Sequence, residues 1–196
     1  MIIRGDGAAL LVVDVQKDFC PGGALPVPDG DRVVGALNQY IEECVAQGIP
    51  VYASRDWHPS ITTHFKPYGG LWPPHGVQGT DGAGFHPNLR LPPTAILVTK
   101  GEDADRAGYS AFEGRTPEGK PLLSDLAERG VHHIYVGGLA TDYCVVYSVF
   151  DALAAGLQVT VLEDAIAGVD RDDSARALAQ MRARGAEVAG AAFAKG

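Results

Sequence analysis

Short apolar runs alternate with helix-like patterns along this chain of 196 residues. The runs are too short for typical helices and are rich in Val, Ile and Leu, which is typical of strands buried on both faces of a sheet. They cover residues 8–13, 49–54, 95–99, 132–136, 157–162 and 186–189. The helical patterns cover residues 31–47, 121–129, 142–155 and 172–184.

This alternation of strands and helices predicts an α/β fold, because parallel strands are joined by crossover helices that cover the sheet. We expect a three-layer α/β/α, Rossmann-like architecture with a central, mostly parallel sheet of six strands. The length fits one domain, and no internal repeat or linker divides the chain. A single domain over residues 1–196 is therefore expected.

The composition excludes several classes of protein. A net charge of −8 argues against a nucleic-acid-binding surface, which needs clustered Lys and Arg. A small or cationic partner, or simple solubility, fits that charge. The chain shows no signal-peptide pattern and no apolar stretch near the roughly 20 residues that span a membrane. Its three cysteines form no CxxC pair. We expect a reduced, cytoplasmic protein, either a monomer or a homo-oligomer.

Residues 57–93, between the second and third predicted strands, show no clear periodicity. They contain seven of the thirteen prolines, both tryptophans and four of the six histidines. A long irregular loop inside a compact domain is usually functional or disordered, and its aromatic residues argue against disorder. We expect an insertion loop with a binding function.

Reactive side chains follow the predicted strands. Ligand sites of open parallel sheets lie beyond the carboxyl ends of the strands. The residues at these ends are Asp14, the segment Arg55 to His58, Lys100, the segment Gly137 to Ala140, and Asp164. One edge of the sheet is therefore expected to carry the chemistry.

Asp56 and three histidines of the loop, His58, His64 and His75, form a candidate metal site. Imidazole and carboxylate ligands suit one divalent ion, with Zn²⁺ as the first choice and Fe²⁺ or Mn²⁺ as alternatives. The alternative is that these histidines are solvated or cap the loop.

Cys144 stands at the start of a predicted helix, where the helix dipole favours a thiolate. A thiolate is a nucleophile for acyl transfer and needs a partner, which Asp14 as base and Lys100 as cation would supply. Alternatively, Cys144 is a small core residue and Lys100 extends its ammonium to solvent. Cys20 and Cys44 are expected to be core thiols.

The segment Gly137 to Cys144 is a glycine-containing turn from strand to helix. Its backbone N–H groups could form an oxyanion hole, although an ordinary connecting turn has the same composition. The GxGxxG spacing of a dinucleotide loop is absent.

Several motifs together resemble one known family. They are Val13-Asp14-Val15-Gln16 with Asp18-Phe19, Arg55 to Pro59 with His64-Phe65, Trp72 to His75, Lys100-Gly101, and Gly138 to Val145. This combination resembles the isochorismatase-like cysteine hydrolases, and the DWHP, His64 and WPPH motifs resemble their metal-containing nicotinamidase and pyrazinamidase branch. The resemblance covers residues of about 8 to 190.

The resemblance implies a role for each matching residue. Asp14, Lys100 and Cys144 would be the catalytic triad, and the N–H groups of Ala140 and Cys144 the oxyanion hole, next to a cis Leu139–Ala140 bond. Phe19, Trp72, Tyr109 and Leu139 would bind substrate, and Asp56, His58, His64 and His75 would bind metal. Members of this branch differ in whether two or three of the histidines bind the metal at once, and His64 is the ligand that this difference concerns. Some relatives have Cys in place of Gly76 and His in place of Tyr143, and His86 is expected to be structural.

The implied activity is metal-dependent hydrolysis of nicotinamide to nicotinate and ammonia in NAD salvage, with pyrazinamide as a second substrate. One alternative is a related hydrolase that acts on another small amide, an N-carbamoyl compound or a vinyl ether. A non-catalytic binding protein of the same fold is the other.

Overall fold

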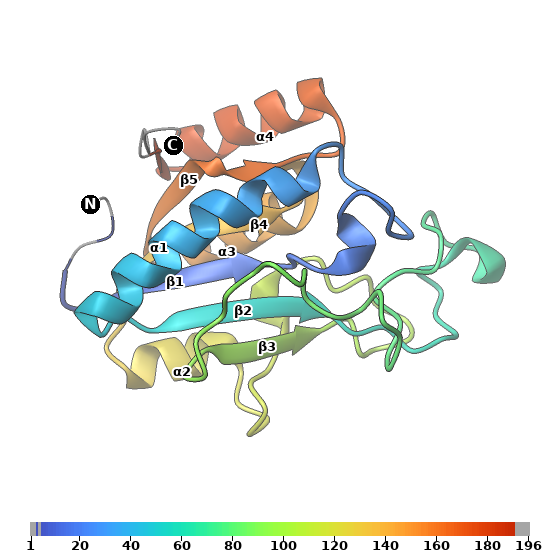
Figure 1. Cartoon of the computed structure of the whole chain (residues 1–196), viewed down its shortest axis with the longest axis horizontal. Helices are drawn as coiled ribbons and strands as arrows, with labels where there is room; N and C mark the ends of the chain where they lie inside the picture. Colours follow the sequence, from blue (N-terminus) through green and yellow to red (C-terminus); the bar gives the residue numbers. More distant parts are fainter. Residues whose placement is uncertain (1–2, 4, 191–196) are drawn as a thin grey trace.

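The computed structural model describes residue 3 and residues 5–190. Six strands form one sheet in the order β3-β2-β1-β4-β5-β6, and all neighbouring strands are parallel (Figure 1). The strands are β1 (Ala8–Val13), β2 (Val51–Asp56), β3 (Ile96–Lys100), β4 (His133–Leu139), β5 (Gln158–Ala167) and β6 (Glu187–Ala189). The predicted six-stranded sheet is confirmed, and it is parallel throughout the described part of the chain.

Helices cover both faces of the sheet, which confirms the three-layer prediction. They are α1 (Val33–Gln47), α2 (Leu122–Glu128), α3 (Val146–Ala154) and α4 (Arg171–Ala183). Side chains alternate between the faces of a strand. In β1, Leu10 and Val12 therefore pack into one core with α1, while Leu11 and Val13 pack into a second core with the other three helices.

The strands β4 and β5 run further than their apolar patterns predict. Gly138 stays within β4 at a bulge, with φ of +124° and its Cα so close to Val13 that a Cβ would lie 2.1 Å from the Val13 carbonyl oxygen. A side chain is excluded there, so the glycine reflects close strand packing. Asp164, predicted to end its strand, lies inside β5 and accepts a hydrogen bond from Tyr40 at 2.9 Å. It does not belong to the site.

The predicted helix 142–155 begins as a π-helical turn, Thr141–Val145, and continues as α3. Such turns are rare and occur often at functional sites. Cys144 therefore lies in a π-helical turn just before α3, and not in the first turn of an α-helix.

The loop 57–93 connects β2 to β3. It first extends beyond the carboxyl ends of the strands, and its last part returns across the face of the sheet to the start of β3 (Figure 1). Its helical structure is one 3₁₀ turn, Lys66–Tyr68. The segment that leaves β1 pairs with the far part of this loop, because Gln16 bridges to Phe85 and Lys17 donates to the Gly84 carbonyl. The loop is thus anchored to the central strand.

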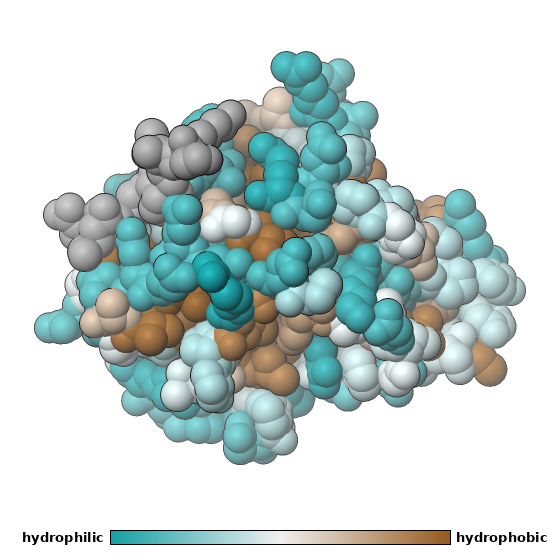
Figure 2. Space-filling model, viewed as in Figure 1, coloured by the Kyte–Doolittle hydropathy of each residue, from teal (hydrophilic) through white to brown (hydrophobic). Residues whose placement is uncertain are grey.

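On the face that carries α1, apolar residues are visible over the middle and lower part of the sheet between polar ones (Figure 2). Partly buried Phe85 and Leu91 of the loop pack there against the first core. Among the described residues, no helix is long and apolar enough to cross a membrane. The single domain over residues 1–196 stays a prediction, because residues 1–2, 4 and 191–196 lie outside the described residues.

Candidate active site

The ends of four neighbouring strands bring Asp14, Asp56, Lys100 and Cys144 together. Asp14 follows β1, Asp56 and Lys100 are the last residues of β2 and β3, and Cys144 follows β4. The strand order reverses between β1 and β4, and ligands of open parallel sheets bind beside this point. All four side chains are buried.

Lys100 is the centre of this group. Its Nζ atom lies 2.8 Å from Asp14 Oδ2, 2.5 Å from Asp56 Oδ1 and 3.6 Å from Cys144 Sγ, and it donates to the Gly108 carbonyl at 3.0 Å. The residue is only 2% exposed. Its ammonium does not extend to solvent, so the alternative considered from the sequence is wrong for Lys100.

Asp14 is held in a strained position. Its φ is +47°, a region that costs a residue with a side chain about 1–3 kcal/mol and is found at functional sites. Ser54 donates to Asp14 Oδ1 at 2.7 Å. The other oxygen, Oδ2, pairs with Lys100 but accepts no hydrogen bond of good geometry. A lone pair on Oδ2 is therefore available for a proton from a neighbouring group.

Burial raises the pKa of Asp14 above its ordinary value, more than the adjacent Lys100 lowers it. Burial likewise raises the pKa of the Cys144 thiol, with Asp14 and Asp56 adding to the rise and Lys100 opposing it. The free protein therefore holds Cys144 as a thiol. This differs from the thiolate expected at a helix start, and desolvation by burial is the largest cause.

Asp56 connects the cysteine group to the histidines. Its Oδ1 atom pairs with Lys100, and its Oδ2 atom lies 3.7 Å from His58 Nε2 and 3.9 Å from His75 Nε2. Burial acts to raise the pKa of Asp56, but Lys100 and His58 overcome it and hold that pKa below its usual range. Asp56 is therefore ionised at neutral pH.

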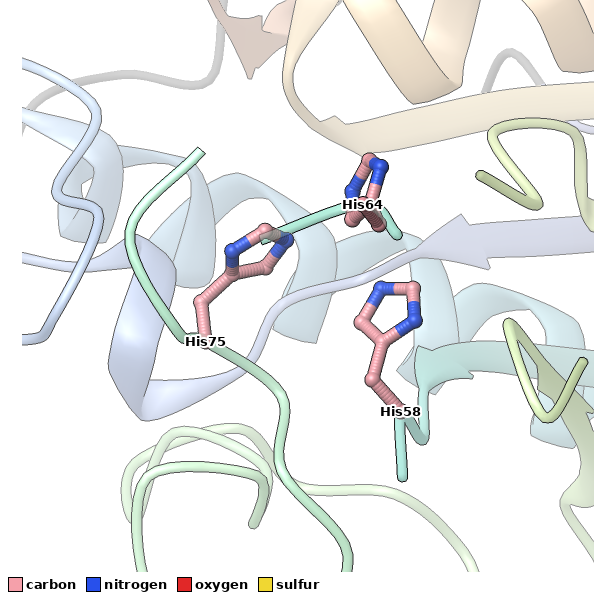
Figure 3. A group of neighbouring side chains, drawn as sticks. All are labelled: His58, His64 and His75. Carbon is pink, nitrogen blue, oxygen red and sulfur yellow. The ribbon is translucent and has the colours of Figure 1, made fainter. Parts of the chain in front are cut away.

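The three predicted histidine ligands converge (Figure 3). Their ring centroids lie 4.8 Å apart for His58 and His64, 5.2 Å for His58 and His75, and 5.3 Å for His64 and His75. One nitrogen from each ring lies within 4.8 Å of the others. Burial lowers the pKa of His75, and it lowers that of His64 to about 4 with help from the neighbouring rings. Both imidazoles are neutral at pH 7, as metal ligands must be.

In two of the rings the Nδ1 atom already has a hydrogen-bond partner in the main chain. His58 Nδ1 is 2.9 Å from the Gly101 carbonyl oxygen, and His75 Nδ1 is 2.7 Å from that of Pro73. Such bonds leave Nε2 to face a metal, as in most histidine sites. His58 Nε2 is buried and has no hydrogen-bond partner. An unpaired buried nitrogen, aimed at two more imidazoles and a carboxylate, fits a divalent ion.

A narrow cavity opens beside both groups. Its lining includes four aromatic side chains, Phe19, Trp72, Tyr109 and Tyr143, and four aliphatic ones, Leu25, Val27, Leu139 and Val169. Cys144, Asp56, His64 and His75 also reach the cavity. All four predicted substrate-binding residues therefore line one space next to the cysteine and the histidines.

The aromatic wall is fixed by contacts between loops. Trp72 Nε1 donates to the Tyr109 hydroxyl at 2.8 Å, and the Trp72 ring meets Tyr143 edge-on at 5.0 Å between centroids. Trp72 comes from the insertion loop and Tyr109 from the segment after β3. The wall thus forms only when both segments are in place.

The turn before Cys144 contains the predicted cis peptide bond between Leu139 and Ala140. The Ala140 carbonyl accepts the N–H groups of Tyr143 and Val145 at 3.0 and 3.1 Å, which fixes the turn against the π-helical segment. The roles of the Ala140 and Cys144 N–H groups in an oxyanion hole stay predictions.

Sequence reasoning missed several residues of the site. Ser54 could have been found, because it lies two residues before Asp56 on the same face of a predicted strand. Leu25, Val27 and Val169 carry no chemical signal, and only the fold brings them to the cavity.

Comparison with known proteins agrees with this geometry. The isochorismatase domain matches residues 8–193, nearly the whole chain. The chain belongs to the isochorismatase domain family. A member of known activity, the nicotinamidase of Escherichia coli, is 42% identical over 92% of this chain and 93% of its own.

Two solved structures resemble this isochorismatase-domain protein closely. The pyrazinamidase of Pyrococcus horikoshii, in complex with zinc, superposes with a TM-score of 0.89 at 42% identity and covers 94% of this chain and 99% of its own. PnC1 from L. infantum, in complex with nicotinate, has a TM-score of 0.84 at 31% identity and covers 97% and 96%.

Proposed function

We propose that this chain is a metal-dependent amidohydrolase that converts nicotinamide and water to nicotinate and ammonia. The proposal rests on one observation, which is that two groups of side chains lie next to the same cavity. One is a buried cysteine with an acid and a lysine, and the other is a histidine cluster on the opposite side of Asp56. The nicotinamidase relative supports nicotinamide, and the pyrazinamidase supports pyrazinamide as a second substrate. The nicotinate formed would enter NAD salvage.

The first half-reaction uses the free lone pair of Asp14. Asp14 Oδ2 takes the proton of Cys144, and the sulfur attacks the carboxamide carbon. The oxygen of the tetrahedral intermediate accepts hydrogen bonds from the N–H groups of Ala140 and Cys144. Asp14 then gives its proton to the leaving nitrogen, the C–N bond breaks, and ammonia departs from a thioester on Cys144.

The second half-reaction reuses the same base. Asp14 takes a proton from water, whose oxygen attacks the thioester carbon, and the C–S bond breaks as Cys144 regains a proton. Lys100 remains charged throughout, since the neighbouring Asp14, Asp56 and Cys144 outweigh burial and raise its pKa. Its positive charge favours the ionised forms of Asp14 and Cys144 in turn.

His58, His64, His75 and Asp56 would hold the metal ion. When bound, a divalent ion, Zn²⁺ as first choice and Fe²⁺ or Mn²⁺ as alternatives, would supply a Lewis acid for a nitrogen lone pair of the substrate. The aromatic wall of Phe19, Trp72, Tyr109 and Tyr143 encloses the ring, and Leu139 is one of its aliphatic neighbours. These contacts orient the carboxamide toward Cys144.

The side chains that line the cavity suit an uncharged amide. None of the described residues that line the cavity is Arg or Lys. The nearest ammonium, on Lys100, is already paired with two carboxylates. A cytoplasmic location and the oligomeric state stay predictions from the sequence.

Ammonia release from nicotinamide tests this proposal. We expect turnover by the untagged protein, loss of turnover after dialysis against a chelator, and recovery with added Zn²⁺. N-carbamoylsarcosine serves as the competing substrate. Turnover of that compound without turnover of nicotinamide would reject the substrate assignment, and full activity in protein free of divalent ions would reject the metal.

A further inference from the structure

Two polar residues of the first motif, Gln16 and Asp18, take no part in the chemistry proposed above. Both are buried, Gln16 completely. Buried polar side chains are normally retained only with hydrogen bonds that satisfy them. Apart from the Ala24 N–H, which donates to Asp18 Oδ1 at 3.3 Å, their partners are main-chain atoms of the segments that carry the metal-binding side chains.

Gln16 holds the main chain of Asp56. Its Oε1 atom accepts the Asp56 N–H at 2.7 Å, and its Nε2 atom donates to the Asp56 carbonyl at 2.8 Å. The second hydrogen of Nε2 goes to the Ala83 carbonyl, also at 2.8 Å. The amide therefore binds both main-chain groups of Asp56 and ties them to the far part of the insertion loop.

Asp18 holds the other end of the histidine cluster. Its Oδ2 atom accepts the N–H of Gly76 at 2.9 Å, and Gly76 directly follows His75. The Gly76 carbonyl in turn accepts the N–H of His58 at 2.8 Å. Gly76 also packs against Asp56 so closely that a Cβ would lie 2.8 Å from the Asp56 Cβ. One carboxylate thus fixes the residue that joins three of the four metal-binding positions.

We propose that Gln16 and Asp18 are positioning residues that set the affinity of the histidine cluster for its divalent ion. They fix the main chain of Asp56, His58 and His75 before the metal binds. The loop between His58 and His75 is long and irregular, so without these bonds each binding event would carry the entropic cost of ordering it. His64 is held by other groups, since its N–H donates to Thr62 Oγ1 at 3.2 Å and its carbonyl accepts the Trp72 N–H at 3.4 Å.

This inference rests on the metal site proposed above, and its test measures metal binding directly. Zn²⁺ affinity is measured on purified, metal-free protein by competition with a chromophoric chelator, for the parent and for Gln16→Met and Asp18→Asn. Gln16→Met keeps the side-chain length and removes all three hydrogen bonds. Asp18→Asn keeps one acceptor oxygen.

Asn38 provides the matched control. It is a buried amide in α1 that donates to the Asn88 carbonyl at 2.9 Å and accepts the Arg90 N–H at 2.8 Å. Asn38→Leu therefore also removes hydrogen bonds between a side-chain amide and the main chain of the loop, but at a place distant from the histidines. Circular dichroism shows whether each variant is folded. The rate at which Cys144 is alkylated in the metal-free protein shows whether the surroundings of the cysteine are unchanged.

Loss of a residue that supports metal ligands typically costs about 10- to 100-fold in affinity. We expect this loss in Gln16→Met, a smaller loss in Asp18→Asn, parental affinity in Asn38→Leu, and recovery of kcat at saturating Zn²⁺. Parental affinity in both site variants, or an equal loss in Asn38→Leu, would overturn the inference. If Gln16→Met does not fold, the Zn²⁺ affinity of Asp18→Asn relative to the parent decides whether the inference holds. If the parent binds no Zn²⁺, the proposed metal site itself is wrong.

Discussion

Lys100 Nζ lies 2.5 Å from Asp56 Oδ1, and this contact joins the cysteine group to the histidine cluster. The other oxygen of Asp56 faces the histidines, at 3.7 Å from His58 Nε2. One carboxylate therefore divides its two oxygens between the lysine and the metal-binding side. A substitution in the cysteine group therefore changes the electrostatic environment of the histidine cluster through Asp56, and the reverse also holds.

Lys100→Met is expected to destabilise the protein as well as abolish turnover. It leaves two buried carboxylates without their cation, and breaking a buried ion pair by removing one partner costs about 3–5 kcal/mol. Urea unfolding of metal-free protein measures this loss. Lys17→Met is the control, because its ion pair with the exposed Asp81 lies at the surface and such pairs contribute about 0–1 kcal/mol. Equal stability of the parent and Lys100→Met would contradict the central position of Lys100.

Cys144→Ala is expected to remove ammonia release while the protein stays folded. Removal of an enzyme nucleophile costs about 10⁴-fold or more in kcat. Cys44→Ala is the control, because Cys44 is buried in the first core and burial raises its pKa to about 12. Turnover is measured for both variants at saturating nicotinamide and Zn²⁺. Turnover in Cys144→Ala near the parental rate would reject this nucleophile.

The parts of the fold that follow from local pattern could be predicted. The boundaries of β1 match the apolar run of residues 8–13, because every residue of that strand is buried and polar residues follow it. The rule that chemistry gathers at strand ends also places Asp14, Lys100 and Cys144 correctly, since each ends or follows a parallel strand.

The parts that depend on contacts between distant segments could not be predicted. Gly137 and Gly138 indicate a turn, yet β4 continues through them. A side chain is excluded by Leu37 and Ala165 at Gly137 and by Val13 of β1 at Gly138. A helix start predicts a thiolate at Cys144, and only the structure reveals that burial beside two carboxylates raises its pKa. The hydrogen bonds from Gln16 reach Asp56, which is 40 residues away in the sequence, and no local sequence pattern predicts contacts of this kind.

The stability of the metal-free protein is expected to fall as the pH drops from about 6.5 to about 4. Burial lowers the pKa of His64 to about 4 from its ordinary 6.5, so in this window the unfolded chain binds a proton that the folded chain does not. Each such proton lowers the free energy of unfolding by up to about 1.4 kcal/mol for each pH unit of the decrease. His75 acts in the same direction.

Urea unfolding at several pH values in the presence of a chelator measures this dependence. Because other groups titrate as well, the difference between the parent and His64→Gln isolates the contribution of His64. His132→Gln, at an exposed position before β4, is the control for removal of a histidine outside the cluster. A slope in His64→Gln equal to that of the parent would show that this ring does not become protonated on unfolding.

Gly101→Ala is expected to weaken Zn²⁺ binding because of a direct clash with His58. A Cβ at Gly101 would lie 2.5 Å from Cε1 of that ring, and the residue also has φ of +73°. The left-handed backbone alone costs a residue with a side chain about 1–2 kcal/mol. Gly79→Ala separates the two effects, because Gly79 has φ of +76° and a Cβ there would have no atom of another segment within 4 Å. Unfolding experiments should show a loss in both variants, and chelator competition should show weakened Zn²⁺ binding in Gly101→Ala alone. Equal affinities in the two variants would mean that the His58 ring moves aside without cost.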